Sequence, residues 1–151
     1  MKSIRYSSGV KYRFIGTKDP EYPEERSLRS EVLIRPFGIT PGAEVFPTED
    51  QSYHLVAIDE GRVVGCAIFI PEGKTGRICQ MAVVPFLQKK GLGAALMSRL
   101  EKRLRGEEFE DAYLHARHYA VGFYERMGYR IEGEPFEEVG MKHFVMRKAL
   151  T

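Results

Sequence analysis

The stretch PFLQKKGLGAALMSRLEKRLR, residues 85–105, combines a short segment of lysine and glycine with a long amphipathic run. The residues before it, ICQMAVV (78–84), are apolar enough to form a buried strand. After the glycines, leucines recur at every fourth position and predict a helix with one buried stripe, made by Leu92, Leu96, Leu100 and Leu104. The stretch therefore predicts a strand that is joined to a helix through a basic, glycine-containing loop.

This loop predicts a binding site for a negatively charged group. The first N–H groups of a helix have no partner within the helix, and the positive end of the helix dipole lies beside them. Gly91 and Gly93 carry no side chain that would block a phosphate, and Lys89 and Lys90 add positive charge. On spacing alone, a turn that only lets the helix pack closely on the strand is an equally good interpretation.

The spacing of the glycines excludes two common nucleotide sites. A P-loop needs four residues between its glycines and then a Lys-Ser/Thr pair, and the chain has neither. A dinucleotide-binding loop needs Gly or Ala three positions after Gly93, where the chain has Leu96. If the loop binds a ligand, a diphosphate fits it better than a single carboxylate does.

The composition indicates one small domain. The chain has 151 residues, of which 43% are hydrophobic, and a formal net charge of +2. We therefore expect a single domain over 1–151 that binds neither nucleic acid nor a membrane. No segment is apolar and long enough for a signal peptide or a membrane span. Cys66 and Cys79 lie in apolar runs without CxxC spacing, which is typical of reduced cysteines in a cytoplasmic protein.

The pattern of turns and apolar positions predicts an α+β fold. The expected order of elements is β-α-β-β-β-α-β-α-β-β, in which the only clear βαβ unit is centred on the stretch quoted above. YHLVAID and RVVGCAIFI are separated by Glu60 and Gly61, which predicts an antiparallel hairpin. The sheet should therefore be mostly antiparallel with one parallel pair.

Several segments resemble the GNAT superfamily of N-acetyltransferases. QMAVVPFLQKKGLGAALMSRLE (80–101) is similar to motif A, in which a strand is followed by Q/R-x-x-G-x-G/A and a helix. AVGFYERMGY (120–129) is similar to the later motif A-x-x-F-Y-x-x-x-G-F/Y. LRSEVLIRPFGI (28–39) and FEEVGMKHFVMRKAL (136–150) resemble the bacterial ElaA-like branch. Together the resemblance covers nearly the whole chain from about residue 25.

The resemblance implies a fold and a co-substrate. The expected fold is a mixed central sheet of six to seven strands with about four helices, splayed between the strands around 77–84 and 112–116. Acetyl-CoA would lie in the splay as a co-substrate, without a metal. Its pantetheine arm would pair with the backbone of Met81, Ala82 and Val83. Its diphosphate would contact the segment that contains Gln88, Lys89, Lys90, Gly91, Leu92, Gly93 and Ala94.

The resemblance also implies a direct transfer of the acetyl group to a primary amine of a small molecule or peptide. A backbone N–H near Met81 or Ala82 would hold the oxyanion. Tyr124 would act as general acid toward the departing thiolate, and the alternative is that it only packs in a short helix. Neither cysteine has a basic neighbour in sequence that would argue for a covalent intermediate.

The general base is left open by the sequence. Many relatives have a glutamate near the position of Gln80, and glutamine cannot accept the proton. The remaining candidates are His115, which is the first choice, His143 and Glu138, and each could equally be an ordinary structural or surface residue. His115-x-x-His118 lacks a clear third ligand for a metal. Arg117 replaces an asparagine that contacts the pantetheine arm in many relatives, so this contact is in doubt.

The acceptor is mostly unreadable from the sequence. In the superfamily the acceptor site comes from the segments that match 31–50 and 134–143 here. An acidic rim on them would suit a cationic amine, and its candidates are Glu44, Glu49, Asp50, Glu134, Glu137 and Glu138. The acyl chain preference and a homodimer stay open. The rival hypothesis is a catalytically weak coenzyme A-binding module or regulator with the same fold.

Overall fold

The computed structural model describes residues 9–151 and contains one seven-stranded sheet. Its strands lie side by side in the order β1-β2-β3-β4-β5-β7-β6. Their bounds are β1 Lys11–Ile15, β2 Tyr53–Asp59, β3 Arg62–Glu72, β4 Thr75–Val83, β5 Asp111–Arg117, β6 Arg130–Glu138 and β7 Met141–Ala149. All neighbours are antiparallel except β4 and β5, which are parallel. The predicted mixed, mostly antiparallel sheet is confirmed.

Three α-helices accompany the sheet in residues 9–151, as in the order of elements expected from the turns and one fewer than the about four that the resemblance implied. They are α2 Tyr22–Arg29, α3 Leu92–Gly106 and α4 Val121–Arg126. The first continues through a π-helical turn, Ser30–Ile34, and a 3-10 turn, Arg35–Phe37. The segment before β2 contains Pro41, Gly42 and Pro47 and holds only a short 3-10 turn, Glu49–Gln51. Within the described part of the chain, no helix is long and apolar enough to cross a bilayer.

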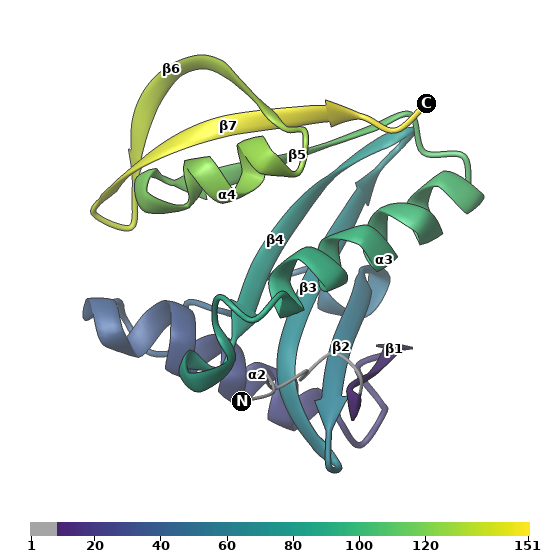
Figure 1. The fold of residues 1–151 in the computed structure, drawn as a ribbon. Coiled ribbons are helices and arrows are strands. Elements are labelled where there is room, and N and C mark those ends of the chain that lie inside the picture. The colour runs from purple at the N-terminus through teal and green to yellow at the C-terminus, as the bar shows by residue number, and fades with distance from the viewer. Residues whose placement is uncertain (1–8) are drawn as a thin grey trace, which may run out of the picture.

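The helices cover the two faces of the sheet (Figure 1). α3 lies on one face, where the four leucines of its predicted stripe are completely buried and pack with Ile78 and Leu114 of the sheet. α2 lies against β3 and β4 on the other face, and Leu28 packs there with Val56 and Ala82. The period-four spacing of the leucines therefore identified both the helix and its buried side correctly.

The parallel strands β4 and β5 separate soon after they pair. Only Arg77 with Tyr113 and Ile78 with Leu114 are in register, although the two strands are nine and seven residues long. Figure 1 shows the strands close at one end and well apart at the other. Beyond Ile78, the backbone groups of β4 on this side therefore have no partner in β5. A splayed edge of this kind can accept an extended ligand as an additional strand.

Candidate active site

The loop between β4 and α3 presents the free start of a helix at the open end of the splay. Gly91 has a φ of 94°, which places it in the left-handed region, and no side chain caps the N-terminus of α3. The side chain of Gln88 donates a hydrogen bond of 2.9 Å to the carbonyl of Val83 and thereby ties the loop to the end of β4. Lys89 and Lys90 are exposed. Uncapped N–H groups beside two cations fit the phosphates of coenzyme A.

Glycine is favoured at positions 91 and 93 for different structural reasons. A Cβ atom on Gly91 would meet nothing within 4 Å, so the positive φ is what favours glycine there. A Cβ atom on Gly93 would lie 3.3 Å from the ring of Phe123 in α4. The close-packing interpretation therefore applies to Gly93, while the geometry of a ligand loop applies to Gly91. Leu92 has a fully buried side chain, so only its backbone could contact a ligand.

A bulge in β4 lies beside the splay. Gln80 has a φ of 54°, and the register with β3 shifts at this point, between the pairs of Cys66 with Ala82 and of Ile68 with Cys79. Two hydrogen bonds hold the bulge: the thiol of Cys66 donates to the carbonyl of Gln80 at 3.2 Å, and Arg29 donates to its side-chain oxygen at 3.4 Å. The bulge interrupts the strand directly before Met81 and Ala82, the predicted oxyanion donors.

Tyr124 of α4 is buried and packs edge-to-face against Phe123 and Tyr129, with ring centroids 5.0 and 6.0 Å away. Burial raises the pKa of its hydroxyl above the ordinary value, and the nearby Cys79 raises it further. The hydroxyl is therefore protonated near neutral pH and can donate a hydrogen bond. Both interpretations of Tyr124 given above are compatible with this environment, because the ring packs and the hydroxyl remains a donor.

His115 and Glu138, two of the predicted candidates for the general base, contact each other. The Nδ1 atom of His115 lies 3.1 Å from a carboxylate oxygen of Glu138 in β6. Since a carboxylate can only accept, Nδ1 carries the proton and Nε2 keeps its lone pair. Burial and the charge of Arg77 lower the pKa of His115, and the bond to Glu138 opposes this only in part. His115 is therefore neutral near pH 7 and can accept a proton.

His143, the third candidate, is positioned differently. It is buried, and its Nδ1 donates a hydrogen bond of 2.9 Å to the carbonyl of Met141 in its own strand. Its Nε2 lies 3.7 Å from Glu138. The side chain of His143, in β7, is 4% exposed, whereas that of His115 is 21% exposed and belongs to the strand that forms one side of the splay. This placement favours His115 over His143 as the group that faces a substrate.

Arg117 stands where many relatives have an asparagine that contacts the pantetheine arm, and in this structure it contacts other parts of the protein. Its guanidinium donates a hydrogen bond of 2.8 Å to the carbonyl of Leu33, which follows α2, and lies over the ring of Phe37 at 4.6 Å. It also contacts the hydroxyl of Tyr119 at 3.3 Å. Arg117 therefore connects the end of β5 to the segment after α2 across the open splay, and its guanidinium is engaged by the protein itself.

Two of the acids expected on the acceptor rim are buried elsewhere. Glu44 and Glu49 are 5% and 8% exposed, and each pairs with an arginine of α2. Glu49 holds Arg29 through both of its oxygens, and Tyr22 donates to it at 2.8 Å. The prediction of an acidic rim is therefore wrong for these two residues, because they are buried and pair with Arg26 and Arg29 of α2.

Sequence analysis missed a buried charged cluster below α2. It consists of Glu25, Arg29, Glu49 and His54, all of them less than 9% exposed. Arg29 contacts Glu25 at 2.8 Å, and His54 contacts Glu25 at 3.0 Å. The spacing of Glu25 and Arg29, four residues apart in a predicted helix, was the available signal. The two glutamates and His54 could by distance hold a cation, but the guanidinium of Arg29 already bridges the carboxylates.

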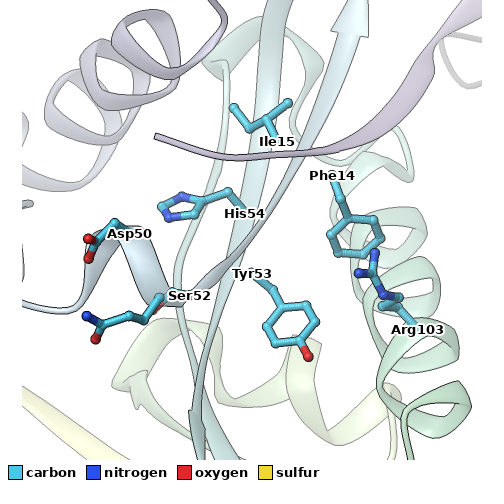
Figure 2. Close-up of a pocket in the computed structure, with 8 residues that line it drawn as sticks. Phe14, Ile15, Asp50, Ser52, Tyr53, His54 and Arg103 are labelled. Carbon is cyan, nitrogen blue, oxygen red and sulfur yellow. The ribbon is translucent and has the colours of Figure 1, made fainter. Parts of the chain in front are cut away.

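A shallow pocket lies away from the splay, between β1, β2 and α3. Figure 2 shows its lining, in which the guanidinium of Arg103 packs over the ring of Phe14, with Tyr53 below them. Ile15, Asp50, Gln51, Ser52 and His54 complete the pocket. Of the residues predicted for the site, only Asp50, a candidate for the acceptor rim, lines it, and none of the predicted catalytic or cofactor-binding residues do. The splay, rather than this pocket, is therefore the candidate active site.

Comparison with known proteins gives a consistent result. Residues 41–150 match the family model of the acetyltransferase (GNAT) domain. The chain is 28% identical over 122 residues to YjcF of Bacillus subtilis, an uncharacterized N-acetyltransferase, and the match covers 80% of this chain and 87% of YjcF.

Solved structures agree in fold. ElaA of Escherichia coli superimposes with a TM-score of 0.81 at 18% identity, covering 92% of this chain and 99% of ElaA. An aminoglycoside 6'-N-acetyltransferase in complex with coenzyme A superimposes with a TM-score of 0.77 at 16% identity, covering 93% of this chain and 97% of that one. At these identities the likeness concerns the fold alone.

Proposed function

The chain belongs to the GNAT acetyltransferase family, and from that premise we propose that it transfers an acetyl group directly from acetyl-CoA to a primary amine of a small molecule or peptide. The observation that carries this proposal is the splay of β4 and β5, which separate after two paired positions. Around the splay lie the uncapped start of α3, the hydroxyl of Tyr124 and the pair of His115 with Glu138.

Acetyl-CoA would bind along the free edge of β4. The phosphates would accept hydrogen bonds from the backbone N–H groups of Lys89 through Ala94, and the two lysines would add screened attraction. The amides of the pantetheine arm would pair with the backbone of Met81, Ala82 and Val83, where β4 has no partner in β5. The choice of co-substrate is supported by the structural relative that was solved in complex with coenzyme A.

Transfer would proceed by direct attack. An ammonium first gives one proton to Nε2 of His115, and the free amine then attacks the thioester carbonyl while a backbone N–H near Met81 or Ala82 holds the oxyanion. The C–N bond forms and the C–S bond breaks, and Tyr124 donates a hydrogen bond or proton to the departing thiolate. The products are an amide, coenzyme A and one proton released to solvent for each turnover.

The cysteines do not favour an acyl-enzyme intermediate. Burial raises the pKa of the Cys79 thiol to about 12 and that of Cys66 well above its usual value. Both therefore remain protonated thiols at neutral pH, and a thiol is a poor nucleophile compared with its thiolate. A single displacement step is consistent with this environment.

The test is a thiol-release assay with acetyl-CoA and a panel of primary amines, run beside a calorimetric titration of coenzyme A. We expect turnover with some amines, and a decrease of roughly tenfold to a thousandfold in the single-turnover rate of Tyr124→Phe with unchanged coenzyme A affinity. Coenzyme A binding without turnover of any amine would favour the rival binding module. Normal single-turnover chemistry in Tyr124→Phe would remove that residue from the mechanism.

A further inference from the structure

Two arginines lie on the sheet face that carries His115, and they differ in how fully the protein neutralises them. Arg147 of β7 donates two hydrogen bonds to Glu132, at 2.9 and 3.2 Å, and one to Asp111 at 3.2 Å. Its guanidinium also lies over the ring of Tyr113 at 5.0 Å. Arg147 therefore has its charge and its donors satisfied within the protein.

Arg77 of β4 is not satisfied in the same way. Within residues 9–151, its one ion contact is with Glu138 at 3.8 Å, which is too long for a hydrogen bond. Its Nε is buried and has no hydrogen-bond partner among these residues, while 31% of its side chain is exposed. An arginine has five N–H donors in a planar fork that suits a carboxylate or phosphate. Arg77 thus presents a cation whose donors are largely free.

The carboxylate that forms the ion contact with Arg77 is already engaged. Glu138 accepts from His115 at 3.1 Å and lies 3.7 Å from His143. A single carboxylate therefore faces two imidazole rings and one guanidinium. Two further acids that the sequence suggested for the acceptor rim, Glu44 and Glu49, pair with the arginines of α2 instead. The guanidinium of Arg77 therefore has no carboxylate within hydrogen-bond distance, and its donors remain available to a ligand.

Arg77 is also close to the proposed base. It pairs with Tyr113 across the parallel strands, and Tyr113 precedes His115 by two residues on the same face of β5. Side chains two residues apart on one strand are separated by roughly 6–7 Å. An anion held by Arg77 and an amine presented to His115 would thus be separated by a distance that one small molecule can span.

We propose that Arg77 is the anion subsite of the acceptor, so that the preferred acceptor is a small primary amine that also carries a carboxylate or a phosphate. Only the part of this proposal that concerns the amine rests on the proposed function. The anion half depends on the free donors of Arg77 and can be tested by binding. This acceptor class differs from the purely cationic amine that an acidic rim would have favoured.

The experiment compares amines that differ only in the anion. The carboxylate arm uses unbranched ω-amino acids from glycine to 6-aminohexanoate, each beside its carboxamide, and the phosphate arm uses aminoalkyl phosphates beside the corresponding amino alcohols. We expect at least one spacer length at which the anionic member has a kcat/KM about tenfold or more above that of its neutral partner. The arm with the larger ratio identifies the anion.

Substitutions locate the effect. In Arg77→Gln the preference for the anionic member should disappear, and in Arg77→Lys, which keeps the charge, it should partly return. Arg147→Gln is the matched control, because that arginine shares the face but is already satisfied, and its preference should equal that of the wild type. Arg77 also lowers the pKa of His115, so Arg77→Gln should raise that pKa and move the acid limb of the kcat/KM profile to higher pH. This shift affects the anionic amine and its neutral partner equally, so the ratio of their kcat/KM values at each pH is independent of it.

Binding separates the two proposals. Butyrate and hexanoate lack the amine, and calorimetry in the presence of coenzyme A should show that they bind to the wild type and several-fold more weakly to Arg77→Gln. Equal binding to both proteins, or equal turnover of anionic and neutral amines, would overturn the anion subsite. Failure of every amine to release thiol while butyrate still distinguishes the two proteins would overturn the transferase proposal and leave the anion subsite supported.

Discussion

Two clusters of charged side chains lie on the same face of the sheet, and they differ in how completely they are closed. The buried cluster contains Glu25, Arg29, Glu49 and His54, and the splay cluster contains Arg77, His115, Glu138 and His143. In the buried cluster both carboxylates contact Arg29, and no member is more than 8% exposed. In the splay cluster the side chains of Arg77 and Glu138 are 31% and 37% exposed. The charges of the buried cluster are paired with one another, whereas the splay cluster is partly exposed and can contact a ligand.

The histidines of the two clusters show what this difference does. Each contacts a glutamate through Nδ1, at 3.0 Å for His54 and 3.1 Å for His115. Burial opposes the charge on His54, but the bond to Glu25, the carbonyl of Glu49 and the two carboxylate charges outweigh it and raise its pKa. Burial and Arg77 together lower the pKa of His115 despite Glu138. The same pair of residue types therefore has a histidine pKa shifted upward in one place and downward in the other, and the lowered pKa of His115 favours the neutral form that can act as a base.

The largest effect should come from opening the buried cluster. Arg29→Met removes the cation that Glu25 and Glu49 share and leaves two carboxylates buried beside one histidine. We expect the free energy of unfolding to fall by about 3–5 kcal/mol. Urea denaturation measures this change. Arg147→Met is the matched control, because its side chain is 35% exposed and its ion pairs should contribute only about 0–1 kcal/mol. Equal losses in the two variants would contradict the distinction between closed and open clusters.

The next effect should appear in turnover rather than in stability. His115→Gln keeps a polar side chain of similar size and removes the base, so kcat/KM for an amine acceptor should fall by about a hundredfold or more. Stability should change little, since His115 is only partly buried. His143→Gln should retain most of the turnover because that ring is buried and its Nδ1 is bonded to the carbonyl of Met141. If His143→Gln lost more activity than His115→Gln, the two histidines would have to exchange roles.

The sequence predicted best what depends on local pattern. The loop and helix around 85–105, the hairpin of β2 and β3 and the parallel join of β4 and β5 follow from spacing and turn residues along the chain. The pairing of His115 with Glu138 could not be read, because β7 lies between their strands and only the sheet order places them together. The buried cluster also depends on tertiary packing, since Glu49 comes from a segment without regular periodicity.

A smaller effect is the dependence of stability on pH. His54 faces Glu25, the carbonyl and carboxylate of Glu49, and the ring of Tyr22. Its pKa is raised in the folded state above the ordinary value of about 6.5, so its contribution is fully present below pH ~6.5 and is lost as pH rises through the folded pKa. Urea midpoints measured from pH 6 upward should decline over this window, and the decline should be absent in His54→Gln. A midpoint that rises over the same window would mean that His54 is neutral in the folded protein.

The smallest change in stability should accompany Glu138→Gln, which removes the carboxylate of the splay cluster. Its side chain is 37% exposed, so the free energy of unfolding should change by only about 0–1 kcal/mol. Glu138 raises the pKa of His115, and its removal should therefore lower that pKa and move the acid limb of the kcat/KM profile to lower pH. Arg77→Gln should move the same limb in the opposite direction, because Arg77 lowers the pKa. Opposite shifts from two neighbours of one ring would identify His115 as the titrating base, whereas an acid limb that neither variant moves would assign the base to another group.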